Sequence, residues 1–326
     1  MWDFSMTKAL GLMRRTAPFV LFRIAVYFGI SAAFIVATGT GAGIGYGVGV
    51  AGTDEFQVNT TFWGGAVGFG LTAGVLFFVR DYILYIVKAG HIAVMVEVME
   101  GGTIPDGRGQ IDHARRIVAE RFGEASALFA LDQLIKGVVG AITGLAQGLL
   151  TLLPIPGFDI VMGAVRAYLR VAVGLVDEVI LAHGIRTKAQ NPWSGAQEAL
   201  VLYAQNARPM LINAAWLALF SWGLSLVVFL VMLAPAAVVV YILPGTWSAG
   251  GLVFALLFAW AVKAALIEPF AIACLLQVFF RVTEGQEPNP EWQARLATAS
   301  DTFRRLGERA LASTGNGFAG QALRAR

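Results

Sequence analysis

Long runs of apolar residues alternate with short polar segments along most of this chain. A helix needs about 20 consecutive apolar residues to cross the roughly 30 Å hydrocarbon core of a bilayer. Windows of this kind predict six membrane-spanning helices, at Pro18–Thr38, Phe62–Tyr82, Leu134–Leu153, Phe158–Val179, Met210–Leu233 and Gly251–Ala273. We expect the second helix to continue to Met99 and the sixth to Val282. The pattern therefore predicts an all-α polytopic membrane protein.

Two-faced segments precede the odd-numbered spans, at Phe4–Arg15, Ile111–Phe122 and Trp193–Ala207. An apolar stripe opposite basic residues is typical of a helix that lies on a membrane surface. We therefore expect cytoplasmic interfacial helices whose basic side chains face lipid headgroups. Similar residues recur in the segments before the first and fifth spans. This suggests an internal repeat, in which a unit of one interfacial helix followed by two spans occurs three times. The alternative is that such helices accompany any hydrophobic hairpin.

The repeat hypothesis divides one membrane domain into residues 1–100, 101–188 and 189–288. A further amphipathic helix is expected over residues 289–312. Its apolar stripe would consist of Trp292, Leu296, Ala299, Phe303, Leu306 and Ala310. The glycine-containing tail, residues 313–326, is expected to be disordered.

Composition supports the membrane assignment. Apolar residues make up 57% of the 326 residues, and charged residues only 14%, compared with about 25% charged residues in soluble domains. So few charges could not cover a soluble fold of this size, so part of the solvent must be lipid. The lone cysteine, Cys274, excludes a disulfide scaffold.

The distribution of positive charge predicts the orientation. Lys and Arg are absent from three segments between spans, at residues 39–61, 154–157 and 234–250. Because basic residues favour the cytoplasmic side, both termini are expected to be cytoplasmic. We expect a bacterial-type inner (plasma) membrane, and the net charge of +3 is not interpreted as nucleic-acid binding.

Glycines recur at helix-packing intervals. Gly140, Gly144 and Gly148 occur in the third span, and Gly64 and Gly68 in the second. Small residues at this spacing let helices approach closely, as in a glycine zipper. The run 39–49 has glycine at every odd position, and it could be a close-packing helix or a loop that reaches back into the bundle.

Ionisable residues inside the spans are the strongest functional signal. The cations are Arg23, Arg80, Lys136, Arg166, Arg170 and Lys263, and the anions are Asp81, Asp132, Asp177, Glu178 and Glu268. A lone charge at the bilayer centre costs at least about 2.5–3.5 kcal/mol, so these groups need partners or water. None lies in the predicted outer third of the membrane. This predicts a polar cleft that opens to the cytoplasm.

The ligand-binding residues we predict for this cleft are Arg166, Arg170, Asp177, Lys263, Glu268, Asp132 and Lys136. Arg166 and Arg170 suit an anionic headgroup or substrate. Glu268 precedes Pro269 and suits a protonatable or cation-binding role. Asp132 and Lys136 are four residues apart and can pair on one helix face. The alternative is that these charges form ion pairs that fix helix register, while Arg23, Arg80 and Asp81 snorkel to the interface.

Catalytic and metal-binding motifs are weak or absent. The three histidines, His91, His113 and His183, lie in separate polar segments without metal-ligand spacing. The chain has no HExxH, Walker or Gly-x-Ser-x-Gly motif. We therefore expect neither an enzyme nor a resident cofactor or metal.

The region from Trp193 onward resembles the C-terminal part of the choline-transporter-like family. The likeness rests on Ser194–Ala199, on Asn206-Ala207-Arg208 before the fifth span, and on the acidic stretch at the end of the sixth, which runs from Gln277 through Glu284 to Pro288. It covers about a third of the chain and lacks that family's large extracellular loop. The resemblance implies transport of a small amine, which aromatic residues such as Trp216, Trp222 and Trp260 would cradle.

The sequence thus predicts an integral inner-membrane protein that binds or transports a small polar or lipid-like molecule through a cytoplasm-facing cleft. Expected partners are membrane lipids, including anionic headgroups, together with a small-molecule ligand and further membrane-protein chains or copies of itself. The competing hypothesis is a non-catalytic accessory or scaffold subunit of a membrane complex, whose glycine faces serve assembly.

Overall fold

The computed structural model describes residues 2–107, 109–122, 131, 133–138, 175–242 and 250–324. All regular secondary structure in these ranges is helical. The helices are α1 (Met6–Arg15), α2 (Ala17–Gly49), α3 (Asp54–Met99), α4 (Gly109–Phe122), α7 (Val176–Arg186), α8 (Pro192–Gln205), α9 (Ala207–Ile242), α10 (Gly250–Val262), the π-helix η1 (Lys263–Ile267), α11 (Glu268–Val282), α12 (Pro290–Ala299) and α13 (Asp301–Arg324).

Four stretches of the described helices are long and apolar enough to cross a membrane: Ala17–Gly49, Asp54–Phe77, Ala207–Ile242 and Gly251–Val282. They coincide with the first, second, fifth and sixth predicted spans. The other two, Leu134–Leu153 and Phe158–Val179, lie mostly outside the described residues. The four helices are compatible with an integral membrane protein.

The glycine run 39–49 is helical, because α2 continues to Gly49. A short connection follows, and α3 then begins at Asp54, earlier than the predicted Phe62, and ends at Met99, as predicted. The Thr53 hydroxyl oxygen accepts a hydrogen bond from the Phe56 amide at 3.3 Å, which caps the first turn of α3. At 33 residues, α2 is about 50 Å long, so it exceeds the hydrocarbon core.

Glycines let α2 and α3 approach each other backbone to backbone. A Cβ atom on Gly41 would collide with the Gly64 carbonyl, and one on Gly45 would collide with the Thr60 carbonyl. Gly68 faces the Ala37 carbonyl in the same way. By contrast, a Cβ on Gly43 would meet no atom within 4 Å. One side of the glycine run therefore fits against α3, while the other is open.

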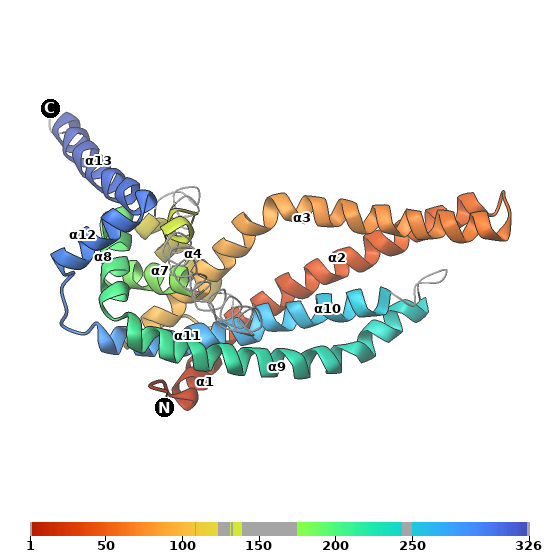
Figure 1. Cartoon of the computed structure of the whole chain (residues 1–326), viewed down its shortest axis with the longest axis horizontal. Coiled ribbons are helices and arrows are strands. Elements are labelled where there is room, and N and C mark those ends of the chain that lie inside the picture. The colour runs from red at the N-terminus through yellow and green to blue at the C-terminus, as the bar shows by residue number, and fades with distance from the viewer. Residues whose placement is uncertain are drawn as a thin grey trace, which may run out of the picture. The chain divides into compact units, whose positions relative to one another are not determined.

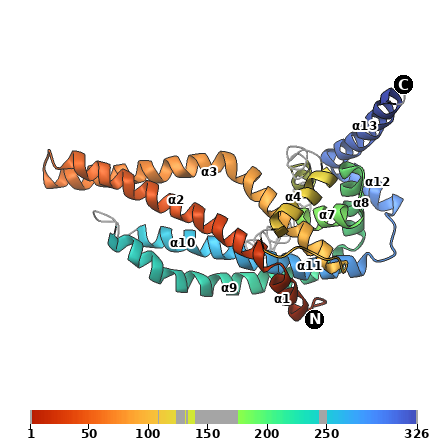
Figure 2. The ribbon, with the colours of Figure 1, turned by 180° about the vertical axis from the view of Figure 1, so that it is seen from behind.

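The chain forms two compact units. Unit 1 comprises residues 1–18, 88–219 and 270–326, and unit 2 comprises residues 19–87 and 220–269. In unit 2, α2 pairs with α3 and α9 pairs with α10 (Figures 1 and 2). One apolar cluster there joins Phe254 and Phe258 of α10 to Ala236 and Val239 of α9.

The fifth predicted span ended too early. Its helix, α9, passes through Pro235 and ends at Ile242, whereas the sequence suggested a connecting segment from residue 234. A proline removes one backbone donor and disfavours the helical conformation of the residue before it, which makes it a common helix boundary. Packing against α10, through Ala236 and Val239, supports the helix beyond this point.

In unit 1, α8 is an internal helix. Its apolar side, including Ala196 and Leu200, is buried, and α8 packs against α7, α12 and α13. The expectation that the apolar stripe of this segment rests on lipid is therefore wrong for α8. Small side chains such as Ala196 and Ala199 let neighbouring helices cover the stripe instead.

The predicted C-terminal amphipathic helix is two helices. Ser300 has an extended backbone and separates α12 from α13. Its hydroxyl oxygen accepts a hydrogen bond from the Phe303 amide at 3.3 Å and so caps α13. Four residues of the predicted apolar stripe are buried: Leu296, Phe303, Leu306 and Ala310.

The expected disordered tail is helical in the structure, because α13 extends to Arg324. Each glycine in a helix costs only about 1 kcal/mol relative to alanine, and Ala, Leu, Gln and Arg in this segment are good helix formers.

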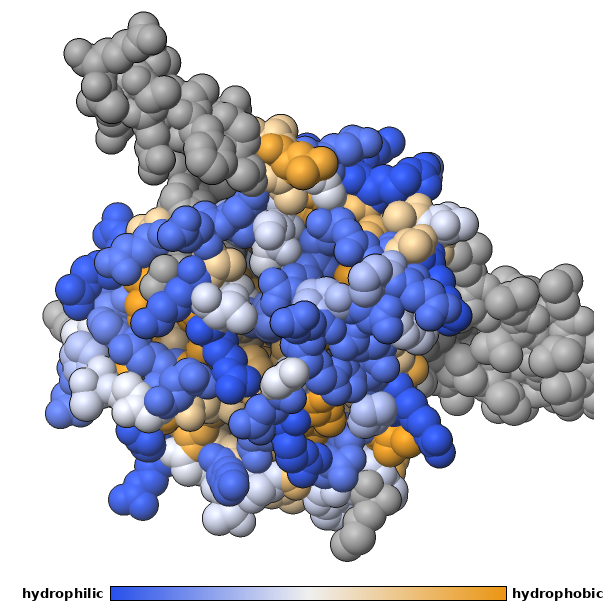
Figure 3. Space-filling view, turned by 90° about the vertical axis from the view of Figure 1, so that its left-hand side faces the viewer, coloured by the Kyte–Doolittle hydropathy of each residue, from blue (hydrophilic) through white to orange (hydrophobic). Residues whose placement is uncertain are grey.

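The face of unit 1 shown in Figure 3 is mostly hydrophilic, with small apolar patches between polar side chains. Such a surface is typical of contact with water.

Candidate functional site

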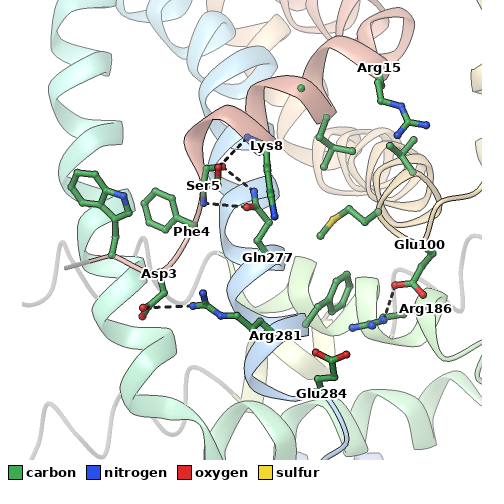
Figure 4. A pocket seen from close by; sticks show the side chains of 16 residues that line it. Asp3, Phe4, Ser5, Lys8, Arg15, Glu100, Arg186, Gln277, Arg281 and Glu284 are labelled. Atoms are coloured by element: carbon green, nitrogen blue, oxygen red, sulfur yellow. Dashed lines mark hydrogen bonds and ion pairs between the residues drawn. The ribbon is translucent and has the colours of Figure 1, made fainter.

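A pocket of about 970 Å³ lies in unit 1. Its walls come from α1 and the residues before it, from the C-terminal ends of α3 and α7, and from the end of α11 (Figure 4). This volume falls within the range of pockets that hold small-molecule ligands. Its lining combines aromatic and aliphatic side chains with seven charged ones: Asp3, Lys8, Arg15, Glu100, Arg186, Arg281 and Glu284.

The residues before α1 are held in place by side chains from two other helices. The Asp3 amide donates to Asn213 Oδ1 at 2.6 Å, and Asn213 Nδ2 donates to Asp3 Oδ2 at 2.9 Å. The Ser5 amide donates to Gln277 Oε1 at 3.1 Å, while Gln277 Nε2 donates to the Ser5 carbonyl at 3.3 Å. Trp2 adds an edge-on contact with Trp216, with ring centroids 5.5 Å apart. These residues therefore form a fixed wall of the pocket.

One face of α1 forms a second wall. Lys8, Gly11, Leu12 and Arg15 all line the pocket, and their spacing of three, one and three residues places them on the same side of a helix. The Ser5 hydroxyl oxygen caps this helix by accepting from the Lys8 amide at 3.3 Å. A side chain at Gly11 would meet no atom within 4 Å. The pocket therefore owes part of its space to this glycine.

Arg186 is committed to neighbours within the pocket. Its Nε atom lies 2.8 Å from Glu100 Oε1. Its guanidinium carbon lies 4.4 Å from the centroid of the Phe280 ring, a cation–π distance. The pair links the end of α7 to the end of α3, so we regard Arg186 and Glu100 as parts of the frame.

The other cations of the pocket retain free donors. Arg281 Nη2 lies 3.6 Å from Asp3 Oδ1, beyond hydrogen-bond distance, and the Arg281 side chain is 55% exposed. Lys8 and Arg15 are exposed and form no ion pair within the described ranges. Glu284 also has no ion-pair partner among the described residues. Three cations with available N–H groups thus line one pocket together with one uncommitted carboxylate.

Two of the predicted site residues, Lys136 and Asp177, come together in unit 1. Lys136 Nζ lies 4.0 Å from Asp177 Oδ2, and the Asp177 side chain is almost fully buried. The next residue, Glu178, accepts a hydrogen bond from Lys88 Nζ at 2.7 Å. Asp132, which the sequence paired with Lys136, lies outside the described residues.

Two other predicted site residues, Lys263 and Glu268, come together in unit 2. Lys263 Nζ lies 3.9 Å from Glu268 Oε1, and Arg23 Nη2 lies 4.0 Å from Glu268 Oε2. The Arg23 side chain is fully buried. Snorkelling to the interface, the alternative considered for Arg23, is therefore wrong. Nothing is described of the side chains of Arg80 and Asp81.

Arg23 also contacts the π-helix. The Glu268 amide bonds to the Lys263 carbonyl, five residues earlier. The next bond of this kind would join the amide of residue 269 to the Ala264 carbonyl, but Pro269 has no N–H. The Arg23 guanidinium donates to that Ala264 carbonyl oxygen instead. Pro269 thus leaves the Ala264 carbonyl without a helical partner, and Arg23 gives this carbonyl a cationic one.

The predicted cleft residues therefore occur as two local groups in different units. Arg166 and Arg170, its proposed anion-binding members, lie outside the described residues. The 970 Å³ pocket is lined by none of the predicted site residues. Of its own cations, Lys8 and Arg15 belong to the predicted interfacial helix whose basic side chains were expected to face lipid headgroups, and Arg281 had served only to predict topology. The spacing of Lys8, Gly11, Leu12 and Arg15 was a signal that could have identified this wall.

The histidines have individual structural contacts. His91 Nε2 lies 3.0 Å from the Thr16 hydroxyl, and His113 Nε2 lies 2.7 Å from Glu97 Oε2. His183 Nε2 lies 3.2 Å from Glu198 Oε1. Burial lowers the pKa of His183 below its usual value, and this outweighs the opposing effect of Glu198. Among the described residues, no group of three His, Cys, Asp or Glu side chains forms a metal-binding cluster.

Comparison with known proteins gives no relative for this chain: it matches no family model, no curated protein and no solved structure. The resemblance to the choline-transporter-like family stays a prediction based on the residues quoted above. Functional inference therefore depends on the chemistry of the pocket and on the four helices that are long and apolar enough to cross a membrane.

Proposed function

We propose that this protein is an integral membrane protein that binds a small polar or lipid-like molecule in the pocket of unit 1. The pocket itself carries the proposal. It is large enough for a metabolite or a lipid headgroup, and its cations Lys8, Arg15 and Arg281 keep donors that the described residues do not use.

The charge distribution along the chain agrees with this proposal. All residues that line the pocket belong to segments that the positive-inside rule assigns to the cytoplasmic side. A ligand would therefore enter from the cytoplasm or from the adjacent leaflet. This retains the inward-facing binding site expected from the sequence but assigns it to different residues.

Gly11 offers a direct way to test binding. Replacing it with tryptophan fills open space in the pocket, and it also removes a glycine from α1, which favours the helix by roughly 0.5 kcal/mol. Gly29→Trp is the matched control, because Gly29 is equally open but lies outside the pocket. Native mass spectrometry of the purified chains measures the retained molecules.

We expect the wild-type chain and Gly29→Trp to retain the same bound species and Gly11→Trp to lose it. Retention that is equal in all three proteins, or absent from all three, would refute the proposed function. The thermal midpoint of each protein serves as the folding control.

A further inference from the structure

The pocket has a specific electrostatic imbalance. Two of its carboxylates have partners: Glu100 pairs with Arg186 at 2.8 Å, and Asp3 accepts a hydrogen bond from Asn213 at 2.9 Å and lies 3.6 Å from Arg281 Nη2. In the described part of the chain, the Lys8 and Arg15 side chains have no hydrogen-bond or ion-pair partner, and Arg281 has only its 3.6 Å ion pair with Asp3, which leaves further N–H donors available. Like charges that line one pocket repel each other, and a bound anion relieves that repulsion.

These three cations come from two helices and line the same pocket. Lys8 and Arg15 lie two turns apart on one face of α1, and Arg281 extends from α11. The Arg guanidinium presents a planar set of N–H donors that matches the oxygens of a phosphate, and Lys adds a compact point charge. Figure 4 shows Glu284 below Arg281, away from Lys8 and Arg15. The negative charge of Glu284 therefore does not occupy the part of the pocket lined by Lys8 and Arg15, where an anion can bind.

Part of the remaining lining is apolar. Trp2 and Phe4 stack at 6.0 Å between ring centroids, and both line the pocket beside Leu12 and Phe280. A phosphate ion alone would leave this wall and most of the 970 Å³ unused. The arrangement fits a ligand with a phosphate at one end and an organic or acyl part at the other.

We propose, on the basis of the proposed function, that the ligand of this pocket is a phosphate-bearing organic molecule whose phosphate is bound by Lys8, Arg15 and Arg281. The phosphate belongs to a lipid headgroup or to a soluble phosphomonoester, and the chemistry of recognition is the same. Neither source requires any covalent step.

The test measures thermal stabilisation of the full-length chain by two probes. One arm adds glycerol 1-phosphate to protein in neutral detergent. The other compares phosphatidylcholine nanodiscs with and without phosphatidic acid. Because a ligand that binds only the folded state raises its stability, the midpoint reports binding. Each arm uses the wild-type chain, Arg15→Gln, Arg281→Gln and Arg14→Gln.

Arg14→Gln is the matched control, because Arg14 is the exposed neighbour of Arg15 on α1 and does not line the pocket. We expect stabilisation of the wild-type chain and Arg14→Gln. For Arg15→Gln and Arg281→Gln we expect at least about tenfold weaker apparent affinity, the loss typical of one charge-assisted hydrogen bond.

The outcomes separate the two sources. Stabilisation by both probes, or by phosphatidic acid alone, supports a lipid headgroup; stabilisation by glycerol 1-phosphate alone supports a soluble ligand. Equal losses in Arg14→Gln and Arg15→Gln would overturn the proposal, because they indicate general surface attraction. If neither probe stabilised any of the four chains, the phosphate proposal would also be overturned. In that case the proposed function would still hold, with another class of ligand, if Gly11→Trp lost a molecule that the wild-type chain retains.

Discussion

Arg23 and Ala264 lie 241 residues apart in the sequence, yet the Arg23 guanidinium donates a hydrogen bond to the Ala264 carbonyl oxygen. This carbonyl lacks a helical partner because Pro269 has no amide hydrogen. A π-helical segment, a helix-breaking residue and a buried cation thus form one structural unit. Such π-helical segments are often located at functional sites, and the adjacent Glu268 and Lys263 were predicted as site residues.

Arg23→Met should lower the free energy of unfolding by about 1–3 kcal/mol, because it leaves the Ala264 carbonyl unsatisfied. Thermal unfolding in detergent measures the change, and Arg208→Met, at an exposed arginine, is the control.

Pro269→Ala restores a backbone donor to this segment, so it should reduce the cost of Arg23→Met. A double-mutant cycle measures this coupling between the two positions. If the two substitutions were simply additive, the Ala264 carbonyl would not be what connects them.

Gly45→Leu should destabilise unit 2 by about 1–3 kcal/mol, the usual cost of overpacking. Its side chain would collide with the Thr60 backbone of α3, whereas Gly43→Leu meets open space on the same helix. Comparing the two thermal midpoints tests whether close approach of α2 and α3 matters. Equal midpoints would contradict the backbone contact.

The buried His183 should make unit 1 less stable in acid. Burial holds its pKa in the folded chain below the ordinary value of 6.5, even with Glu198 at 3.2 Å. As the pH falls, the unfolded chain therefore takes up the proton first. The stabilising contribution is complete above pH 6.5 and declines as the pH falls from there through the folded-state pKa.

His183→Gln should flatten this dependence. Unfolding midpoints measured between about pH 7.5 and about pH 5.5, where histidine titrates, compare the variant with the wild-type chain. Parallel curves for the two proteins would show that His183 makes no contribution in this range.

Gln277→Leu should loosen the wall formed by the residues before α1. It removes both hydrogen bonds between Gln277 and the Ser5 backbone. Hydrogen exchange at the Ser5 amide should therefore become faster, since this amide loses its acceptor. The Ala9 amide, which bonds to the Ser5 carbonyl within the first turn of α1, serves as the internal control. Unchanged exchange at Ser5 would mean that Gln277 does not hold this segment.

The four helices that are long and apolar enough to cross a membrane could be predicted because a long apolar run has few other stable structures. The ends of α3 and α11, at Met99 and Val282, were predicted to the residue. The break at Ser300 was missed, although Ser300-Asp301 is a typical helix start, because the apolar stripe continues across it. The periodicity of apolar residues alone does not distinguish one continuous helix from two consecutive helices whose apolar residues follow the same spacing.

The pocket was harder to predict because its walls come from segments far apart in the chain. Lys8 and Arg281 are separated by more than 250 residues, and only the fold places them around one space. The charges inside spans attracted attention because an unpaired charge there is costly. Asp177, Lys263 and Glu268 have ion-pair neighbours instead. Exposed cations outside the spans gave no comparable signal.

Cysteine labelling tests the central claim, occupancy of the unit 1 pocket, most directly. The native Cys274 is fully buried, so a cysteine introduced at Gly11 or Arg14 would report alone. The measurement is the maleimide reaction rate of Gly11→Cys in delipidated protein, before and after adding back total lipid or aqueous metabolite extract of the host cells. We predict slower labelling at position 11 with at least one extract and an unchanged rate for Arg14→Cys. Equal rates at position 11 with and without both extracts would contradict the account.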